Sequence, residues 1–366
     1  MTDRSVPAHG GQLHAIAARF GVPEESLLDF SASINPAPPS DELVEALCAS
    51  IRARSVIARY PDTNYTALKR AIAEYAGVDE HSICVGNGGM SLLLATIRAL
   101  GVRRCLVLVP AFLEYERVLA SCGVERIPFA LREEEDFAID SQRVLDQLEA
   151  TQADLLLLAN PHSPSGRLLP CTALEELQRS ASALGVYTIV DEAFIDYEPG
   201  QALSRQAAGA RKLVVLRSLT KFFAMPGLRV GYAIAHLELR ARLEATLPLW
   251  PVDSIAAEAA SLALRDITAI EATRENNRKE RGWLSDQLLC KGLTVFPAAA
   301  NYLLFKIGDS LDGLELWRQL IVKHGIVIRS CANFEGLGTR HFRVAVRTRA
   351  ENQRLITALS DSLSGE

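Results

Sequence analysis

The sequence predicts an α/β protein with a large doubly wound domain and a smaller α+β domain. The first observation is length, since 366 residues can bury one large core and a second, smaller one. The second is an alternation of short apolar runs with amphipathic helical stretches through the middle of the chain. The third is that these runs are almost continuously apolar, which is typical of parallel strands covered by helices on both faces.

Each element of the large domain follows from its local pattern. Acidic residues come directly after Ser40, a good N-cap, and predict an amphipathic helix that runs to about residue 51. The segment TALEELQRSASAL predicts a helix over 172–184. Four apolar runs predict strands at 106–109, 155–159, 187–190 and 213–216.

The pattern changes after about residue 250. A long polar helix is predicted over 267–289, and three apolar runs follow it at 302–307, 326–329 and 342–346. Those elements fit a smaller α+β domain. We therefore expect an N-terminal arm with part of the small domain in 1–55, the large domain in 56–260, and the remaining small domain in 261–366.

Composition argues against several classes of function. The formal net charge is -5 and no basic block occurs, so a nucleic-acid partner is not expected. No apolar stretch approaches the ~18 residues of a membrane span, and the N-terminus lacks the apolar core of a signal peptide, so we expect a cytoplasmic protein. The seven cysteines are scattered without a CxxC pair, which favours reduced thiols, and no HExxH-like cluster predicts a metal site.

Lys221 is the first candidate for chemistry. It follows the predicted strand 213–216 and lies among aromatic and sulfur-containing side chains. Such surroundings favour the neutral amine and lower its pKa, and a neutral amine condenses with an aldehyde. Taken alone, the position also fits a lysine that buries only its stem at a strand end. Three side chains close by match the acceptors of a phosphate monoester: Ser218, Thr220 and Arg229.

Two further polar residues each end an apolar run, where open α/β sheets place their ligands. The carboxylate of Asp191 could pair with a protonated ring nitrogen and make that ring an electron sink. The amide of Asn160 could donate to a phenolate oxygen. Taken singly, the aspartate also fits helix capping and the asparagine fits turn chemistry.

A glycine-rich stretch, VGNGGMS at 85–91, precedes the helical run 92–100. A loop that opens a helix in this way offers N–H groups and the positive end of the helix dipole to a phosphate. The stretch is not GxGxxG, so it does not predict a dinucleotide site.

Together these features resemble the fold-type I pyridoxal-phosphate (PLP) enzymes, specifically the aminotransferases. The glycine loop, asparagine, aspartate, lysine and arginine occur in the family's order. NPHSPSG is similar to the NPxxPTG motif, with Ser165 where threonine is usual, and SLTKFFAMPGLRVGY is similar to SxSKxxxxxGxRxGY. The resemblance spans essentially the whole chain and implies a large domain built on a mixed sheet.

The resemblance also implies a cofactor site. Lys221 would hold PLP covalently, with Asp191 on the ring nitrogen and Asn160 on the ring oxygen. Phe112, in VPAFLEY, would stack on the ring. Tyr60, in RYPD, would reach the cofactor phosphate from the neighbouring subunit, which predicts a homodimer with shared active sites. Within one subunit the same phosphate would be bound by Gly88, Gly89, Ser218 and Arg229.

Both ends of the chain resemble one branch of that family. HGG, LLDFSASINP and RYPD near the N-terminus, with IRSCANFEGL and FRVAVR near the C-terminus, are similar to threonine-phosphate decarboxylases of the cobalamin pathway. Those enzymes are close relatives of histidinol-phosphate aminotransferases. The resemblance implies conversion of L-threonine O-3-phosphate to (R)-1-amino-2-propanol O-2-phosphate. Arg343 would bind the substrate carboxylate, and the substrate phosphate would be bound by His9, Gly10 and Arg329.

Two positions depart from family patterns. Ser33 lies where asparagine is usual, next to the substrate, which Asn160 would also contact. Phe194 lies where aminotransferases carry a tyrosine whose hydroxyl bonds the ring oxygen. The decarboxylase relatives also carry phenylalanine there, which favours decarboxylation.

Three alternatives stay open at this point. One is an aminotransferase that acts on histidinol phosphate with 2-oxoglutarate. Another is a decarboxylase that prefers serine phosphate, since a pocket discriminates one methyl group by only ~1–3 kcal/mol. The third is a non-enzymatic PLP-sensing regulator, which would need a DNA-binding module, and the sequence offers no such extension.

Overall fold

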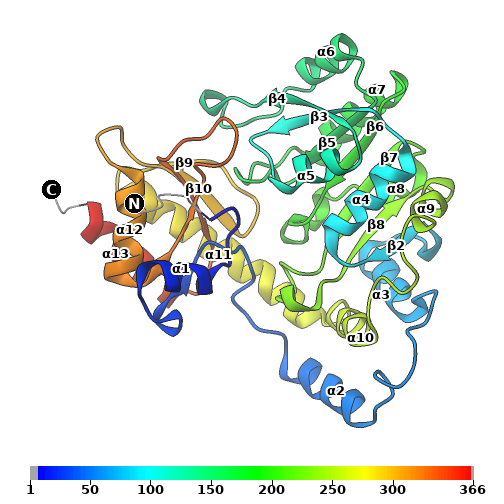
Figure 1. Cartoon of the computed structure of the whole chain (residues 1–366), viewed down its shortest axis with the longest axis horizontal. Helices are drawn as coiled ribbons and strands as arrows, with labels where there is room; N and C mark the ends of the chain where they lie inside the picture. The colour runs from blue at the N-terminus through cyan, green and yellow to red at the C-terminus, as the bar shows by residue number, and fades with distance from the viewer. Residues whose placement is uncertain (1–6, 364–366) are drawn as a thin grey trace.

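The computed structural model describes residues 7–363 and arranges them in two bodies. The large body is built on a seven-stranded sheet and the small body on a four-stranded sheet. The long helix α11 (Ile267–Cys290) runs from one body to the other (Figure 1). It confirms the helix predicted over 267–289, whereas the domain boundaries at 55 and 260 stay predictions.

The large sheet is mixed, and its strand order is β2-β8-β7-β6-β5-β3-β4. Neighbours from β7 to β4 are parallel, and β8 is antiparallel to both β7 and β2. In sheet order the strands are β2 (Ile83–Gly86), β8 (Gly231–Ala235), β7 (Leu213–Ser218), β6 (Tyr187–Asp191), β5 (Leu155–Ala159), β3 (Arg104–Val109) and β4 (Glu125–Ala130). All four predicted strands are therefore confirmed, each in the parallel part of the sheet.

Helices cover both faces of this sheet, as the doubly wound prediction requires. Successive residues of β5 alternate between the two cores, with Leu155 and Leu157 on one face and Leu156 and Leu158 on the other. One face is covered by α4 (Gly88–Leu100), α5 (Glu114–Ser121) and α9 (Leu237–Glu244). The other is covered by α3 (Thr66–Ala76), α6 (Ser141–Thr151), α7 (Cys171–Ala183), α8 (Ser204–Gly209) and α10 (Ser254–Ala263).

The small body has its own core. Its antiparallel sheet has the order β12-β13-β10-β9, with β12 (Arg329–Ser330), β13 (His341–Ala345), β10 (Tyr302–Lys306) and β9 (Thr294–Val295). The core also includes side chains from α1 (Leu13–Phe20), α11, α12 (Gly313–His324) and α13 (Arg349–Leu363). The predicted run 326–329 is divided: β11 (Ile326–Val327) pairs with β1 (Leu28–Asp29), and β12 begins only at Arg329.

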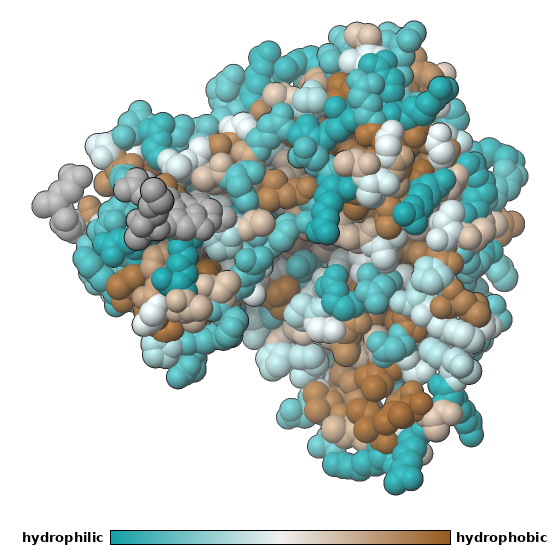
Figure 2. Space-filling view, viewed as in Figure 1, coloured by the Kyte–Doolittle hydropathy of each residue, from teal (hydrophilic) through white to brown (hydrophobic). Residues whose placement is uncertain are grey.

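Helix α2 (Asp41–Arg52) confirms the predicted N-terminal helix, and Ser40 Oγ accepts a hydrogen bond from Leu43 N at 3.4 Å. It packs against α10 and lies apart from both sheets at the bottom of Figure 1. Figure 2 shows hydrophobic atoms on this same lobe. The exposed large apolar side chains of α2 and the segments 57–60 and 249–250 are Val44, Ile51, Ile57, Tyr60, Leu249 and Trp250.

Residues 7–363 contain neither a candidate membrane span nor a candidate metal cluster. No helix in that range is both long enough and apolar enough to cross a bilayer. Within the same range, no group of three or more histidine, cysteine, aspartate or glutamate side chains could hold a metal ion.

Candidate active site

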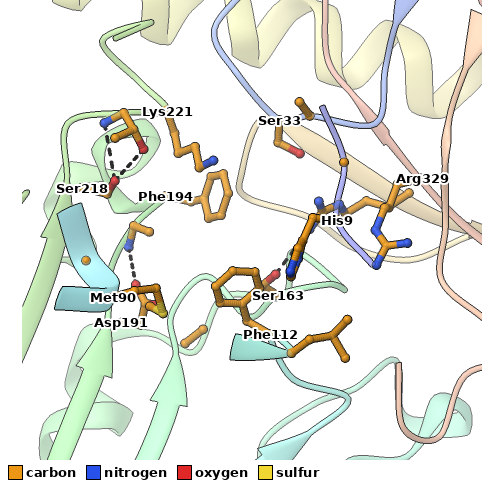
Figure 3. Close-up of a pocket in the computed structure, with 18 of the residues that line it drawn as sticks. His9, Ser33, Met90, Phe112, Ser163, Asp191, Phe194, Ser218, Lys221 and Arg329 are labelled. Carbon is orange, nitrogen blue, oxygen red and sulfur yellow. Dashed lines mark hydrogen bonds between the residues drawn. The ribbon is translucent and has the colours of Figure 1, made fainter. Parts of the chain in front are cut away.

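A cavity of about 240 Å³ lies between the two bodies, at the carboxyl ends of β5, β6 and β7. The last residues of these strands, Ala159, Asp191 and Ser218, all line it. Parallel strands place their ends at one edge of a sheet, so three segments far apart in sequence meet there. Figure 3 shows Lys221 on one side of the cavity and Arg329, from the small body, on the other.

Lys221 lies three residues after β7, and its amine faces the cavity (Figure 3). The N-terminal segment fixes its loop, because Asn35 N donates to Lys221 O at 3.0 Å and Asn35 Nδ2 donates to Phe222 O at 2.9 Å. Burial lowers the pKa of Lys221 to about 8, and the charges of Arg343 and Arg229 act in the same direction. At pH 7 about a tenth of such amines are neutral, far more than at an ordinary lysine pKa.

Asp191 ends β6 with its carboxylate held on two sides. Tyr115 Oη donates to Oδ2 at 2.6 Å, and Ala193 N donates to Oδ1 at 3.0 Å. Burial raises the pKa of Asp191, and both hydrogen bonds oppose that rise because they favour the charged form. Tyr115 was not among the residues predicted from the sequence. Its signal was the FLEY motif, where Tyr115 follows Phe112 by three residues and so shares its side of a helical turn.

The predicted phosphate-binding residues converge at the start of α4. This helix begins at Gly88, four residues before the predicted helical run, so both glycines lie in its first turn. Gly88 has a φ of +73°, which favours glycine, and a Cβ atom there would lie 2.9 Å from Arg229 Nη2 and would displace the guanidinium. Ser218 Oγ and Thr220 Oγ1 lie 2.8 Å apart on the same wall of the cavity. N–H groups, hydroxyls and a guanidinium thus meet where a phosphate monoester would fit.

Asn160 does not line the cavity, although it directly follows β5. Its side chain is buried and bonded to the loop that follows, since Oδ1 accepts from Leu169 N at 2.9 Å and Nδ2 donates to Leu169 O at 3.0 Å. The cavity wall beside it is formed by Ala159 and Ser163. The structure therefore places Asn160 near the predicted site but uses its amide to shape the NPHSPSG loop.

Arg343 enters the cavity from β13. Its guanidinium lies over the Tyr302 ring, 4.8 Å from the centroid, and Nη1 donates to Ser163 Oγ at 3.4 Å. Tyr302 is fixed in turn, because its hydroxyl donates to His162 O at 2.9 Å and its ring packs edge-on against Phe194. Arg343 Nε is buried without a partner within residues 7–363. An oriented guanidinium with an unused donor is suited to a carboxylate.

The three residues predicted to bind the substrate phosphate, His9, Gly10 and Arg329, all line the cavity. His9 and Arg329 lie opposite Lys221 in Figure 3, and Arg329 is the register partner of Arg343 on the neighbouring strand. Arg329 donates to Pro7 O at 3.0 Å and to Ala8 O at 2.7 Å, so it holds the N-terminal segment as well as lining the cavity. Burial lowers the pKa of Arg329 to about 10, which leaves it a cation at neutral pH.

Three other predicted residues take different places. Phe112 lines the cavity, and so does Ser33, whose buried Oγ has no hydrogen-bond partner within residues 7–363. Tyr60 does not line the cavity of its own chain. It is 78% exposed and stacks on Trp250, with 4.3 Å between ring centroids.

A mixed sheet with an activated lysine after β7, a held aspartate after β6 and a glycine-opened helix defines an aminotransferase-fold protein. The model of the family "Aminotransferase class I and II" matches residues 25–359, so the chain belongs to that family.

Named relatives refine this placement. The chain is 37% identical over 362 residues to threonine-phosphate decarboxylase of Salmonella typhimurium, a match that covers 98% of this chain and 97% of that protein. It is 31% identical to the adenosylcobalamin biosynthesis bifunctional protein CobDQ of Leptospira interrogans, over 99% of this chain and 42% of that one. A crystal structure of histidinol-phosphate aminotransferase from Clostridium acetobutylicum has a TM-score of 0.84 and 29% identity, over 92% of this chain and 98% of that one.

Proposed function

We propose that this protein is a PLP-dependent enzyme that converts L-threonine O-3-phosphate to (R)-1-amino-2-propanol O-2-phosphate and CO₂. The observation that carries the proposal is a pair of arginines on one wall of the cavity. Arg329 and Arg343 are register partners in β12 and β13, so their side chains lie on the same face of the small sheet, and both line the cavity. The charge of Arg343 acts on Lys221, whereas Arg329 holds the N-terminal segment that carries His9. A substrate with a carboxylate and a phosphate would meet both. The 37% identity to a threonine-phosphate decarboxylase supports the same substrate.

The residues present fit PLP. Lys221 would hold its aldehyde carbon and Asp191 its ring nitrogen, while Phe112 would lie beside the ring. The cofactor phosphate would lie in the cradle formed by Gly88, Gly89, Ser218 and Arg229. When bound, PLP supplies an electron sink for whichever bond at the substrate Cα stands perpendicular to its ring.

The choice of bond therefore depends on how the protein orients the substrate. Arg343 would hold the carboxylate in place, and its own direction is set by Tyr302 and Ser163. Because negative charge leaves the carboxylate as CO₂ forms, Arg343 acts as an orienting group more than as a transition-state stabiliser. The departing CO₂ is replaced at Cα by a proton. Lys221, whose pKa is about 8, is suited to carry that proton at neutral pH.

Phe194 supports decarboxylation over amino transfer. Its ring lines the cavity and packs on Tyr302, and it offers no hydroxyl to a cofactor oxygen. We place the reaction in cobalamin biosynthesis, because relatives over almost the whole of this chain include the threonine-phosphate decarboxylase and the adenosylcobalamin protein.

We also propose a homodimer with shared active sites. The support is the exposed apolar surface around α2, on which Tyr60 and Trp250 stack with little protection from solvent. Exposed apolar groups that gather in this way are typical of a protein–protein interface. From such an interface, Tyr60 would reach the cofactor phosphate of the partner subunit. A cytoplasmic location stays a prediction from the sequence.

Product analysis tests the proposal. Purified holoenzyme is supplied separately with L-threonine O-3-phosphate, L-serine O-phosphate, and histidinol phosphate plus 2-oxoglutarate. We expect CO₂ from the first substrate, with a kcat/KM about tenfold or more above that for the second if an apolar contact meets the extra methyl group. Glutamate from the third mixture, without CO₂ from the first two, would mean that the protein is an aminotransferase and not a decarboxylase.

A further inference from the structure

We propose that Glu114 is a positioning residue that holds the His9 imidazole at the cavity wall in the orientation that binds the substrate phosphate. The inference rests on the proposed function in one respect, namely that the substrate carries a phosphate. Glu114 is not a lining residue of the cavity, and it acts on the ligand through His9.

The contact joins the N-terminal segment to the large body. His9 Nε2 lies 3.0 Å from Glu114 Oε1, and the imidazole packs on Phe112 with 6.0 Å between ring centroids. Glu114 is the first residue of α5, and its side chain is only 24% exposed. A carboxylate only accepts, so the proton of this bond is on Nε2. Nδ1 is then the ring nitrogen that remains for a ligand, and it donates when the imidazole is protonated.

The backbone on either side of His9 is held by the small body and the N-terminal segment. Arg329 donates to the carbonyls of Pro7 and Ala8, as described above. On the other side, Gly10 packs so closely that a Cβ atom would lie 2.1 Å from Ser31 O. The main chain is thus fixed without the help of α5. The Glu114 contact sets the direction of the ring and not the path of the segment.

Glu114 could also stabilise α5, and the test must distinguish that role from the positioning of His9. An acidic side chain in the first turn of a helix stabilises that helix through its dipole, whatever it contacts. Glu116 provides the matched control, because it lies in the same first turn, is 70% exposed and faces Arg126 at 4.0 Å. Arg117 lies 3.6 Å from Glu114 Oε2, whereas His9 contacts Oε1, so the two contacts use different oxygens of the carboxylate.

A double-mutant cycle on the holoenzyme tests the coupling. The variants are Glu114→Gln, His9→Gln, the double variant and Glu116→Gln. Each is titrated with inorganic phosphate by calorimetry and assayed for kcat and KM with L-threonine O-3-phosphate. We expect Glu114→Gln to weaken phosphate binding and raise KM about fivefold, the size of one lost hydrogen bond, with kcat within about twofold. In the His9→Gln background the same change should alter neither quantity, and Glu116→Gln should match wild type.

The inference would be overturned if Glu114→Gln reduced phosphate affinity equally with and without His9. It would also be overturned if Glu114→Gln left phosphate affinity unchanged in the wild-type background. The phosphate titration does not depend on which reaction the enzyme performs. If the holoenzyme releases no CO₂ yet the cycle in phosphate binding shows the coupling, the positioning role stands and the proposed function falls.

Discussion

Tyr115 donates a 2.6 Å hydrogen bond to Asp191 Oδ2 and thereby joins the start of α5 to the end of β6. Tyr115 is almost fully buried, and its ring also packs edge-on against Phe112 on the cavity wall. One side chain therefore supports both the carboxylate and the aromatic ring that are predicted to contact the cofactor. Because the bond favours the charged carboxylate, Tyr115 helps to keep Asp191 ionised despite its burial.

Removal of this bond should shift activity along the pH axis. Tyr115→Phe keeps the ring and removes one hydrogen bond to a charged group, so the pKa of Asp191 should rise and the acidic limb of the kcat/KM profile should move to higher pH. At pH 7 we expect a loss of about tenfold in kcat/KM. Tyr187→Phe, at the first residue of β6 and outside the cavity, is the control. A pH profile that is identical in the two variants would contradict the role of Tyr115.

Reconstitution of the apoenzyme should report the state of Lys221. Its pKa is lowered from 10.5 to about 8, so the reactive neutral amine becomes the main form above pH 8. We expect the rate of PLP incorporation, followed by absorbance and fixed with borohydride, to rise with pH and level off above about pH 8. Lys221→Ala should fix no cofactor. A rate that still climbs tenfold per pH unit up to pH 10 would indicate an ordinary lysine.

Breaking a buried ion cluster next to the site should lower the free energy of unfolding far more than breaking an exposed ion pair. Arg217 is 3% exposed and pairs with Glu192 and Asp196, which are both buried. Arg217→Met leaves those carboxylates without their cation and should lower the free energy of unfolding by about 3–5 kcal/mol. Urea denaturation measures the loss. Arg211→Met breaks an exposed pair with Glu238 and should cost less than about 0.5 kcal/mol; similar losses in both variants would contradict the account.

Mixed dimers should test whether active sites are shared. Tyr60→Ala and Lys221→Ala each disable a residue that we assign to opposite sides of one site. If Tyr60 reaches the partner's cofactor, a heterodimer of the two variants contains one intact site, and random reassembly restores roughly a quarter of wild-type activity. Sedimentation equilibrium shows whether the dimer forms. A fully active monomer, or a mixed dimer without recovered activity, would exclude sharing through Tyr60.

Four parallel strands, β3, β5, β6 and β7, could be predicted because burial on both faces makes each one an uninterrupted apolar run. Edge strand β4 could not, since Glu125 and Ala130 are exposed and Pro128 interrupts the pattern. Asp191 and Lys221 could be predicted because each follows one of these apolar runs. Their contacts, and those of His9, were not predictable, since Tyr115 and Asp191 are 76 residues apart and Glu114 and His9 are 105 residues apart.

The role predicted for Asn160 stays a prediction. Asn160 has the expected place after β5, but the sequence does not show that both polar atoms of its amide are bonded to Leu169. Such a bond depends on how the NPHSPSG loop closes, which involves contacts from β10, where Tyr302 donates to His162 O. The spacing of a motif therefore predicted the strand end correctly and left the partner of the side chain undetermined.

In the proposed reaction the carboxylate carbon leaves as CO₂ and a proton takes its place at Cα. The most direct measurement supplies the holoenzyme with L-threonine O-3-phosphate in D₂O and quantifies CO₂ together with the deuterium content of the product by NMR. We expect one CO₂ per 1-amino-2-propanol O-2-phosphate, with one deuterium on the former Cα. Return of threonine phosphate with deuterium at Cα and no CO₂, or conversion of its amino group to glutamate when 2-oxoglutarate is added, would contradict the proposed reaction.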